Sequence, residues 1–150
     1  MATVRYTRPG SGIRPRGPLV LLVEDDDNLR ELFASELVGS GFMVLEATDG
    51  STAIDKATRF TPHAIVLDLM LPGVDGFKVA RRLRADDRTA DAVIIAFTGL
   101  MSESMRGLAL AAGCDAFMRK PVLPAALIGE VVRLLASRRA AADMTRVTSR

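Results

Sequence analysis

The sequence holds few of the side chains that crosslink secreted proteins or bind transition metals. Cys114 is the only cysteine and His63 the only histidine in 150 residues. A lone cysteine forms no disulfide within its own chain, so a cytoplasmic protein is expected. One cysteine and one histidine also argue against a dedicated zinc site or a Cys–His nucleophile. His63 follows Pro62 and precedes an apolar segment, and we interpret it as a loop residue.

Long hydrophobic runs are also missing. None approaches the ~20 residues that a membrane-spanning helix needs. The first 18 residues are rich in Arg, Gly and Pro and lack the apolar core of a secretory signal. The rest of the composition, with 49% hydrophobic and 25% charged residues, indicates a folded domain. We therefore expect one globular domain with no membrane partner.

Positive charge is concentrated at the two ends of the chain. Residues 1–17 carry a net charge of +4 and residues 137–150 carry +3, which leaves −5 for the remainder within a total of +2. The ends therefore account for the basic pI, and an acidic body gives no reason to expect direct nucleic-acid binding by the domain. The expected organisation is a flexible basic arm at 1–17, a domain at 18–137 and a flexible basic tail at 138–150.

Short apolar segments alternate with amphipathic ones along the whole body. The apolar segments predict buried strands at 19–23, 42–46, 64–68, 92–97 and 116–118. The intervening patterns predict helices at 28–38, at about 50–60, from 76 onward, at 102–112 and from 124 to about 138. This alternation is typical of an α/β fold with a five-stranded parallel sheet and helices on both faces. The flavodoxin-like strand order 2-1-3-4-5 is the expected topology.

Polar side chains stand where four of these strands end. Glu24 and Asp25 follow the first strand, Asp68 ends the third, Thr98 ends the fourth and Lys120 follows the fifth. Each has an ordinary alternative, since acids favour helix N-termini, a hydroxyl suits a strand end and a lysine suits a solvated loop. Their coincidence at one edge of a parallel sheet, where ligands bind in such folds, favours a functional site.

The chemistry of such an edge is restricted by charge. Two carboxylates ~5 Å apart repel by roughly 3 kcal/mol at an effective dielectric of about 20. Three carboxylates therefore have raised pKa values or recruit a cation, and Mg²⁺ suits a few carboxylates together with a phosphate oxygen. A cation, the Lys120 ammonium and the Thr98 hydroxyl would surround a phosphoryl group on Asp68. We therefore expect Asp68 to act as a nucleophile that forms an aspartyl-phosphate.

Four motifs give the chain a clear resemblance to a known family. LLVEDD, IVLDLMLPGVDG, AFTG and FMRKP occur in this order between residues 21 and 121. In them the chain resembles the receiver domain of two-component response regulators, from about Pro18 to Ser137. The resemblance implies that Asp68 is the phosphoacceptor and that Asp25 ligates Mg²⁺, with Glu24 as its acidic neighbour.

The resemblance also has implications for five other positions. Met70 would complete the metal site through its backbone carbonyl, and Lys120 would pair with the phosphoryl group. Thr98 is similar to the switch hydroxyl and Phe117 to the aromatic residue that moves with it. Pro121 follows Lys120 where the family often has a cis peptide bond.

As a receiver, the chain is expected to take a phosphoryl group from a phosphohistidine of a partner histidine kinase or phosphotransfer protein. It would catalyse only its own phosphorylation and dephosphorylation, and would signal by switching protein–protein contacts through helix 102–112, strand 116–118 and the last helix. With ~13 residues after Ser137, too few for a helix-turn-helix, we expect a stand-alone receiver or a phosphorelay shuttle. Met70 and Leu100 are apolar where the family flanks the attacking water, which predicts slow self-dephosphorylation.

Three other classes remain as alternatives. A phosphohydrolase of haloacid-dehalogenase type would also use an aspartate nucleophile, but it needs a second acid where this chain has Met70. A nucleotide- or flavin-binding module would need glycines in the first strand–helix turn, where this chain has Glu-Asp-Asp-Asp. Nucleic-acid binding through the arginine-rich ends would be sensitive to salt.

Overall fold

The computed structural model describes residues 17–99 and 102–149. The predicted arm at 1–17 thus lies almost entirely outside the described residues, as does Leu100. Five strands form one parallel sheet: β1 (Leu19–Val23), β2 (Met43–Ala47), β3 (Ala64–Asp68), β4 (Val93–Thr98) and β5 (Ala116–Arg119). Five helices connect and follow them: α1 (Asp27–Gly39), α2 (Gly50–Phe60), α3 (Gly76–Ala85), α4 (Glu103–Ala111) and α5 (Pro124–Thr148).

The strand order is β2-β1-β3-β4-β5, as predicted. All four neighbouring pairs are parallel, with β1 between β2 and β3. In this order the carboxyl ends of β1 and β3 are adjacent, and β4 brings its own end beside that of β3. The sheet therefore assembles polar residues that are far apart in the sequence along one edge.

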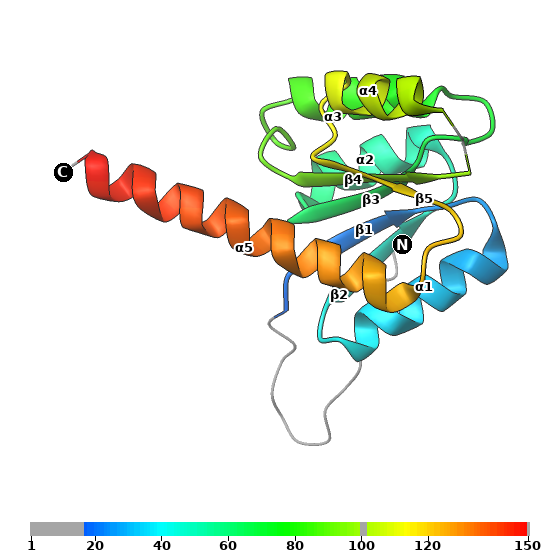
Figure 1. The fold of residues 1–150 in the computed structure, drawn as a ribbon, viewed down its shortest axis with the longest axis horizontal. Helices are drawn as coiled ribbons and strands as arrows, with labels where there is room; N and C mark the ends of the chain where they lie inside the picture. Colours follow the sequence, from blue (N-terminus) through cyan, green and yellow to red (C-terminus); the bar gives the residue numbers. More distant parts are fainter. Residues whose placement is uncertain (1–16, 100–101, 150) are drawn as a thin grey trace.

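Alternation along the strands creates two hydrophobic cores. One strand face packs against α2, α3 and α4, and its fully buried members include Leu21, Ile65, Leu67 and Ile94. The other face packs against α1 and α5, and its members include Leu22, Val66, Ile95 and Phe97. Figure 1 shows the sheet between these two helical layers. Because both faces are covered, the strands are apolar almost throughout, which is why the sequence pattern shows them clearly.

The last helix is longer than the sequence predicts. We expected it to end near Arg138, but α5 continues to Thr148, and its C-terminal part extends beyond the sheet (Figure 1). Its apolar pattern fades after Leu135 because the later residues have no core to face. Residues 138–148 contain neither Gly nor Pro and include three consecutive alanines, so helix propensity continues where packing ends. The predicted tail at 138–150 is thus largely helical.

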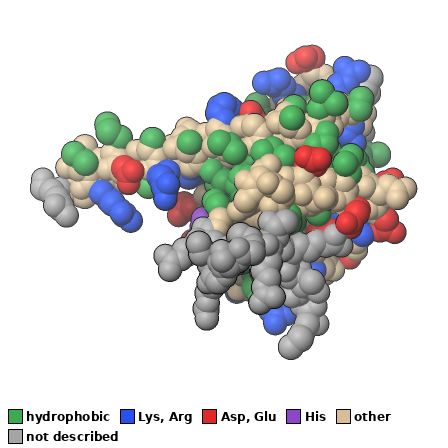
Figure 2. All heavy atoms as spheres, turned by 90° about the horizontal axis from the view of Figure 1, so that it is seen from below, with side chains coloured by type: hydrophobic (Ala, Val, Ile, Leu, Met, Phe, Trp, Pro, Cys, Tyr) green, Lys and Arg blue, Asp and Glu red, His purple; other side chains and the backbone are tan. Residues whose placement is uncertain are grey.

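The protruding part of α5 presents a mixed surface. Figure 2 shows hydrophobic, basic and acidic side chains interspersed along it. Met144 and Val147 are 67% and 73% exposed. Among the described helices none is long and apolar enough to cross a membrane.

One arginine joins three elements at the amino-terminal edge of the sheet. The Arg84 guanidinium donates hydrogen bonds to the carbonyl oxygens of Gly113, Ala90 and Ala92, at 2.6–3.0 Å. It also pairs with Asp115 at 2.9 Å, and Arg138 of α5 contacts the other oxygen of that carboxylate at 3.0 Å. Arg84 therefore ties α3 to the segments that precede β4 and β5.

We expect Arg84→Ala to lower the free energy of unfolding by about 2 kcal/mol, because several carbonyl groups would lose a charged donor. Urea denaturation followed by circular dichroism measures this effect. Arg81→Ala, on the exposed face of the same helix, is the matched control and should stay within about 0.5 kcal/mol of the wild type. Equal effects of the two variants would contradict the role given to Arg84.

Candidate functional site

Three carboxylates meet at the carboxyl edge of the sheet. Glu24, Asp25 and Asp68 each place an oxygen within 4.8 Å of the others. Glu24 and Asp68 are only 1% and 3% exposed, whereas Asp25 is open to solvent. A cluster with two buried members and one accessible member has a solvent-facing side on which a cation could bind. The sequence predicted this convergence from the strand order alone.

Lys120 supplies the positive charge of the cluster. Its Nζ donates to Oδ2 of Asp68 at 2.9 Å and to the two carboxylate oxygens of Glu24 at 3.0 and 3.2 Å. The backbone N–H of Lys120 donates to the carbonyl oxygen of Thr98 at 2.9 Å, which fixes the loop after β5 to the end of β4. The Lys120–Pro121 peptide bond is cis, as the resemblance implied.

The carboxylate of Asp68 is held by both of its oxygens. Oδ1 accepts a hydrogen bond from the backbone N–H of Met70 at 2.9 Å, while Oδ2 accepts from Lys120. Met70 itself leaves its side chain 58% exposed beside the cluster. The Asp68 side chain is thus oriented by the turn that follows it and by Lys120.

Thr98 lies on the strand beside that of Asp68, and Phe117 lies on the next strand, β5. Thr98 ends β4 and is fully buried, next to the strand that ends in Asp68. Phe117 is half-buried in β5 and packs against the core formed with α2, α3 and α4. The structure therefore brings five predicted residues to one edge of the sheet: Glu24, Asp25, Asp68, Thr98 and Lys120. Phe117 lies on β5, which β4 separates from β3.

The four consecutive acids after β1 have different tasks. Asp26 caps α1, since its carboxylate accepts the N–H of Leu29 at 2.8 Å. Asp27 forms an ion pair with Arg30 at 2.6 Å. The ordinary capping explanation thus holds for Asp26 and not for the two residues before it. Only Glu24 and Asp25 of this run face Asp68.

Arg30 is a residue of the site that the sequence reasoning missed. Its guanidinium donates to the backbone carbonyl oxygen of Glu24 at 3.0 Å and lies 3.4 Å from the carboxylate of Glu46 on β2. It therefore anchors the acidic loop through the backbone of Glu24. The only sequence signal is a basic residue one turn into a helix that follows an acidic run, which is also common in ordinary surface helices.

Burial makes the charge of Glu24 costly. The pKa of Glu24 is raised to about 8, mainly by desolvation and also by a hydrogen bond to Asp68, while Lys120 acts in the opposite direction. Desolvation also acts to lower the pKa of Lys120, but its hydrogen bonds to Asp68 and Glu24 outweigh that effect and the pKa is raised. The cluster thus has more negative charge than the single ammonium neutralises, which favours a bound cation.

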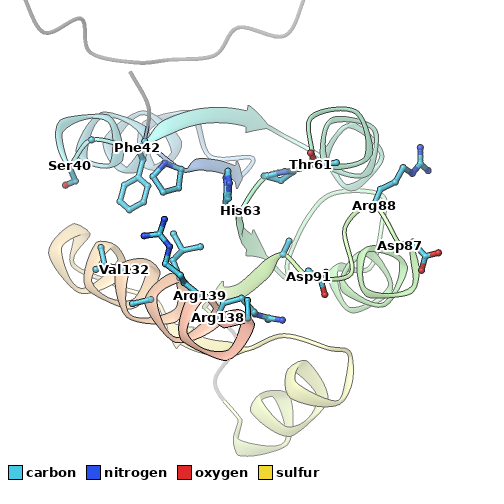
Figure 3. Close-up of a pocket in the computed structure, with 18 residues that line it drawn as sticks. Ser40, Phe42, Thr61, His63, Asp87, Arg88, Asp91, Val132, Arg138 and Arg139 are labelled. Atoms are coloured by element: carbon cyan, nitrogen blue, oxygen red, sulfur yellow. The ribbon is translucent and has the colours of Figure 1, made fainter. Parts of the chain in front are cut away.

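Two hollows flank the sheet at opposite edges. A cleft of about 740 Å³ adjoins the acidic cluster and is lined by Asp25, Met70 and apolar residues of the β3–α3 loop, with Met105 of α4. A second cavity, of about 720 Å³, lies at the amino-terminal edge between α5 and the segments that precede β1 to β4 (Figure 3). His63 lines that second cavity, and its Nδ1 accepts the N–H of Leu19 at 3.0 Å. The lone histidine is thus a loop residue, as predicted, and it lies at the edge of the sheet opposite to the acidic cluster.

The family of this chain is decided by comparison with known proteins. The response regulator receiver domain matches residues 20–132. The chain belongs to this family. It is therefore a phosphoacceptor domain of two-component signal transduction, and the match gives no support to the phosphohydrolase alternative.

Relatives of known role share this domain. The chain is 36% identical over 118 residues to the DNA-binding dual master transcriptional regulator RpaA of Synechocystis. The aligned region covers 79% of this chain and 49% of that protein. It is 34% identical over 119 residues to the phosphate regulon transcriptional regulatory protein PhoB of Pseudomonas aeruginosa, covering 79% of this chain and 52% of that protein. The chain thus spans about half the length of the curated relatives it matches.

Solved structures agree with the receiver fold. A putative response regulator from Chloroflexus aurantiacus superposes with a TM-score of 0.76 at 30% identity, covering 81% of this chain and 99% of that one. The receiver domain of the sensor histidine kinase PA1611 from P. aeruginosa superposes with a TM-score of 0.74 at 31% identity, covering 80% and 98%. That structure has a magnesium ion coordinated in its active-site cleft.

Loss of the lysine should destabilise this receiver in the absence of metal. In Lys120→Met the carboxyl groups of Glu24 and Asp68 would lie close together without a cation, so their repulsion would keep Glu24 protonated, and we expect the free energy of unfolding to fall by about 2 kcal/mol in EDTA at pH 7. Adding Glu24→Gln to that variant removes the carboxyl group that must be protonated and should restore part of the loss. Chemical denaturation measures all three proteins.

Lys78→Met, at an exposed position of α3, is the control and should change stability by less than about 0.5 kcal/mol. If Glu24→Gln destabilises the Lys120→Met protein further, charge repulsion is not the cause of its instability.

Proposed function

We propose that Asp68 accepts a phosphoryl group from a phosphohistidine of a partner histidine kinase or phosphotransfer protein. The observation that carries this proposal is the position of Asp68, which is buried, oriented by Met70 and paired with Lys120 beside two further carboxylates. An oxygen of Asp68 forms the new bond to phosphorus while the bond from phosphorus to the histidine nitrogen breaks. The electron pair of that bond leaves with the imidazole.

We propose Glu24, Asp25 and Asp68 as the residues that hold Mg²⁺, with the backbone carbonyl of Met70 as a further ligand. Oxygen ligands from carboxylates fit this ion, and the cluster has excess negative charge and one side open to solvent. When bound, Mg²⁺ supplies positive charge to the phosphoryl oxygens. A bound cation would also reduce the repulsion among the three carboxylates.

In this proposal the remaining residues of the site stabilise the phosphoryl group and change the surface of the protein in response to it. Lys120 already contacts Asp68 and would pair with a phosphoryl oxygen. The buried hydroxyl of Thr98 would donate to another, and Phe117 would follow it, so that α4, β5 and α5 present an altered surface to a downstream protein. The protein would act as a signalling domain without turnover of an external substrate. The domain is proposed at 18–137, with output through protein contacts.

Phosphorylation of Asp68 is tested by incubation with a small phosphodonor and Mg²⁺ followed by intact mass measurement. We expect the wild type to gain one phosphoryl group and Asp68→Asn to gain none. Asp25→Asn should lose most of the labelling because it removes the accessible metal ligand. Asp26→Asn changes the neighbouring acid, which caps α1, and should retain labelling.

An unlabelled wild type in the presence of Mg²⁺ would refute the proposed function. Continuous hydrolysis of the donor far beyond one equivalent would instead favour a phosphohydrolase.

We also expect the aspartyl-phosphate to persist, because the side chain of Met70 has no polar group with which to orient an attacking water. The phosphoryl lifetime is measured by intact mass after removal of the donor. Met70→Asn introduces a polar amide at this exposed position and should shorten the lifetime several-fold. A wild-type half-life of seconds, or an unchanged lifetime in Met70→Asn, would contradict this prediction.

A further inference from the structure

The ammonium of Lys120 has a third neighbour besides the two carboxylates. Its Nζ lies 4.7 Å from the centroid of the Phe97 ring and over its face. Phe97 is the residue of β4 that pairs with Asp68 of β3, so the ring lies directly beside the nucleophile candidate in the sheet. The ring is completely buried. Lys120 is therefore held between negative charge on one side and an aromatic face on the other.

The Phe97 ring is itself fixed. Phe33 of α1 meets it edge to face, with the ring centroids 5.5 Å apart and an interplanar angle of 89°. Both rings belong to the core between the sheet, α1 and α5. An edge-to-face pair restricts rotation of each ring, so the face presented to Lys120 has one orientation.

We propose that Phe97 is a positioning residue that holds the Lys120 ammonium beside the Asp68 carboxylate. Any large apolar side chain would fill this core position, but only an aromatic ring has a negative face that attracts an ammonium. The need for such a support follows from the lysine side chain, which has a flexible four-carbon stem and many rotamers. The consequence for phosphorylation rests on the function proposed above for Asp68 and Lys120.

The support matters most while the carboxylate is being modified. Lys120 contacts Asp68 through an oxygen whose charge changes when a bond to phosphorus forms. Its hydrogen bonds to Glu24 would then draw the ammonium away from the phosphoryl group. The Phe97 face does not change during the reaction, so it keeps the ammonium in place for the phosphoryl oxygens.

The kinetic test uses Phe97→Leu in the wild-type and Lys120→Met backgrounds. With a small phosphodonor and saturating Mg²⁺, we expect Phe97→Leu to slow labelling of Asp68 roughly fivefold, and to have no further effect once Lys120 is Met. Phe97→Tyr keeps the aromatic face and should restore most of the rate. Phe42→Leu is the matched control, since Phe42 is 7% exposed in the same core but lies at the opposite edge of the sheet and should label at the wild-type rate.

An equal loss of rate from Phe97→Leu in both backgrounds would overturn the proposal, because the effect would then be one of packing. So would a wild-type rate in Phe97→Leu. Failure of the wild type itself to label would instead refute the proposed function. The contact between the Phe97 ring and the Lys120 ammonium is then tested by a second measurement.

That measurement requires no phosphorylation. The chain has three lysines, so ¹³C-labelled lysine gives three sets of ε-methylene signals, and Lys120→Met identifies the one of interest. Ring current from Phe97 should place the Lys120 signal upfield of those from Lys56 and Lys78. Phe97→Leu should move it to their range and Phe42→Leu should not. A Lys120 signal that is already in that range, or that ignores Phe97→Leu, would show that the ring does not hold the ammonium.

Discussion

The shared ammonium of Lys120 is the interaction on which the site depends. Two carboxylates that are almost fully buried lie within hydrogen-bond distance of one nitrogen. Without it, ionising both carboxyl groups at close range in a medium of low dielectric constant would be costly, and the loops that carry them would lose a shared contact. With it, the edge of the sheet keeps a net negative charge that a divalent ion could balance. The arrangement is thus stable and still has capacity to bind.

The surrounding structure serves to keep these groups in register. Arg30 anchors the backbone of Glu24, Met70 orients Asp68 through its N–H, and the carbonyl of Thr98 holds the backbone of Lys120. Each of these supports comes from a different strand end or from α1. Phosphoryl transfer relies mainly on positioning and charge, so a site of this kind needs rigid supports more than it needs further reactive groups.

The two edges of the sheet have different roles, one functional and one structural. The carboxyl edge holds the acids, the lysine and the buried hydroxyl, whereas at the amino-terminal edge Arg84 and Arg138 converge on Asp115. That second cluster joins α3 and α5 to the start of β5. The rearrangement proposed near Thr98 and Phe117 would therefore occur in elements whose opposite ends are held by these ion pairs, which would restrict the response to the part of α4, β5 and α5 near the site. The protruding end of α5 begins at this amino-terminal edge, after Arg138 (Figure 1).

The sequence by itself determined the strands, their parallel order and the identity of the polar residues at their ends, because buried strands are uniformly apolar and any acid that ends them is conspicuous. It did not determine where α5 ends, since beyond the core only helix propensity acts and the apolar period vanishes. It also did not reveal Arg30 or the face of Phe97. Their partners are a backbone carbonyl and an ammonium brought near by the fold, and no spacing along the chain records such contacts. Only the tertiary structure decided them.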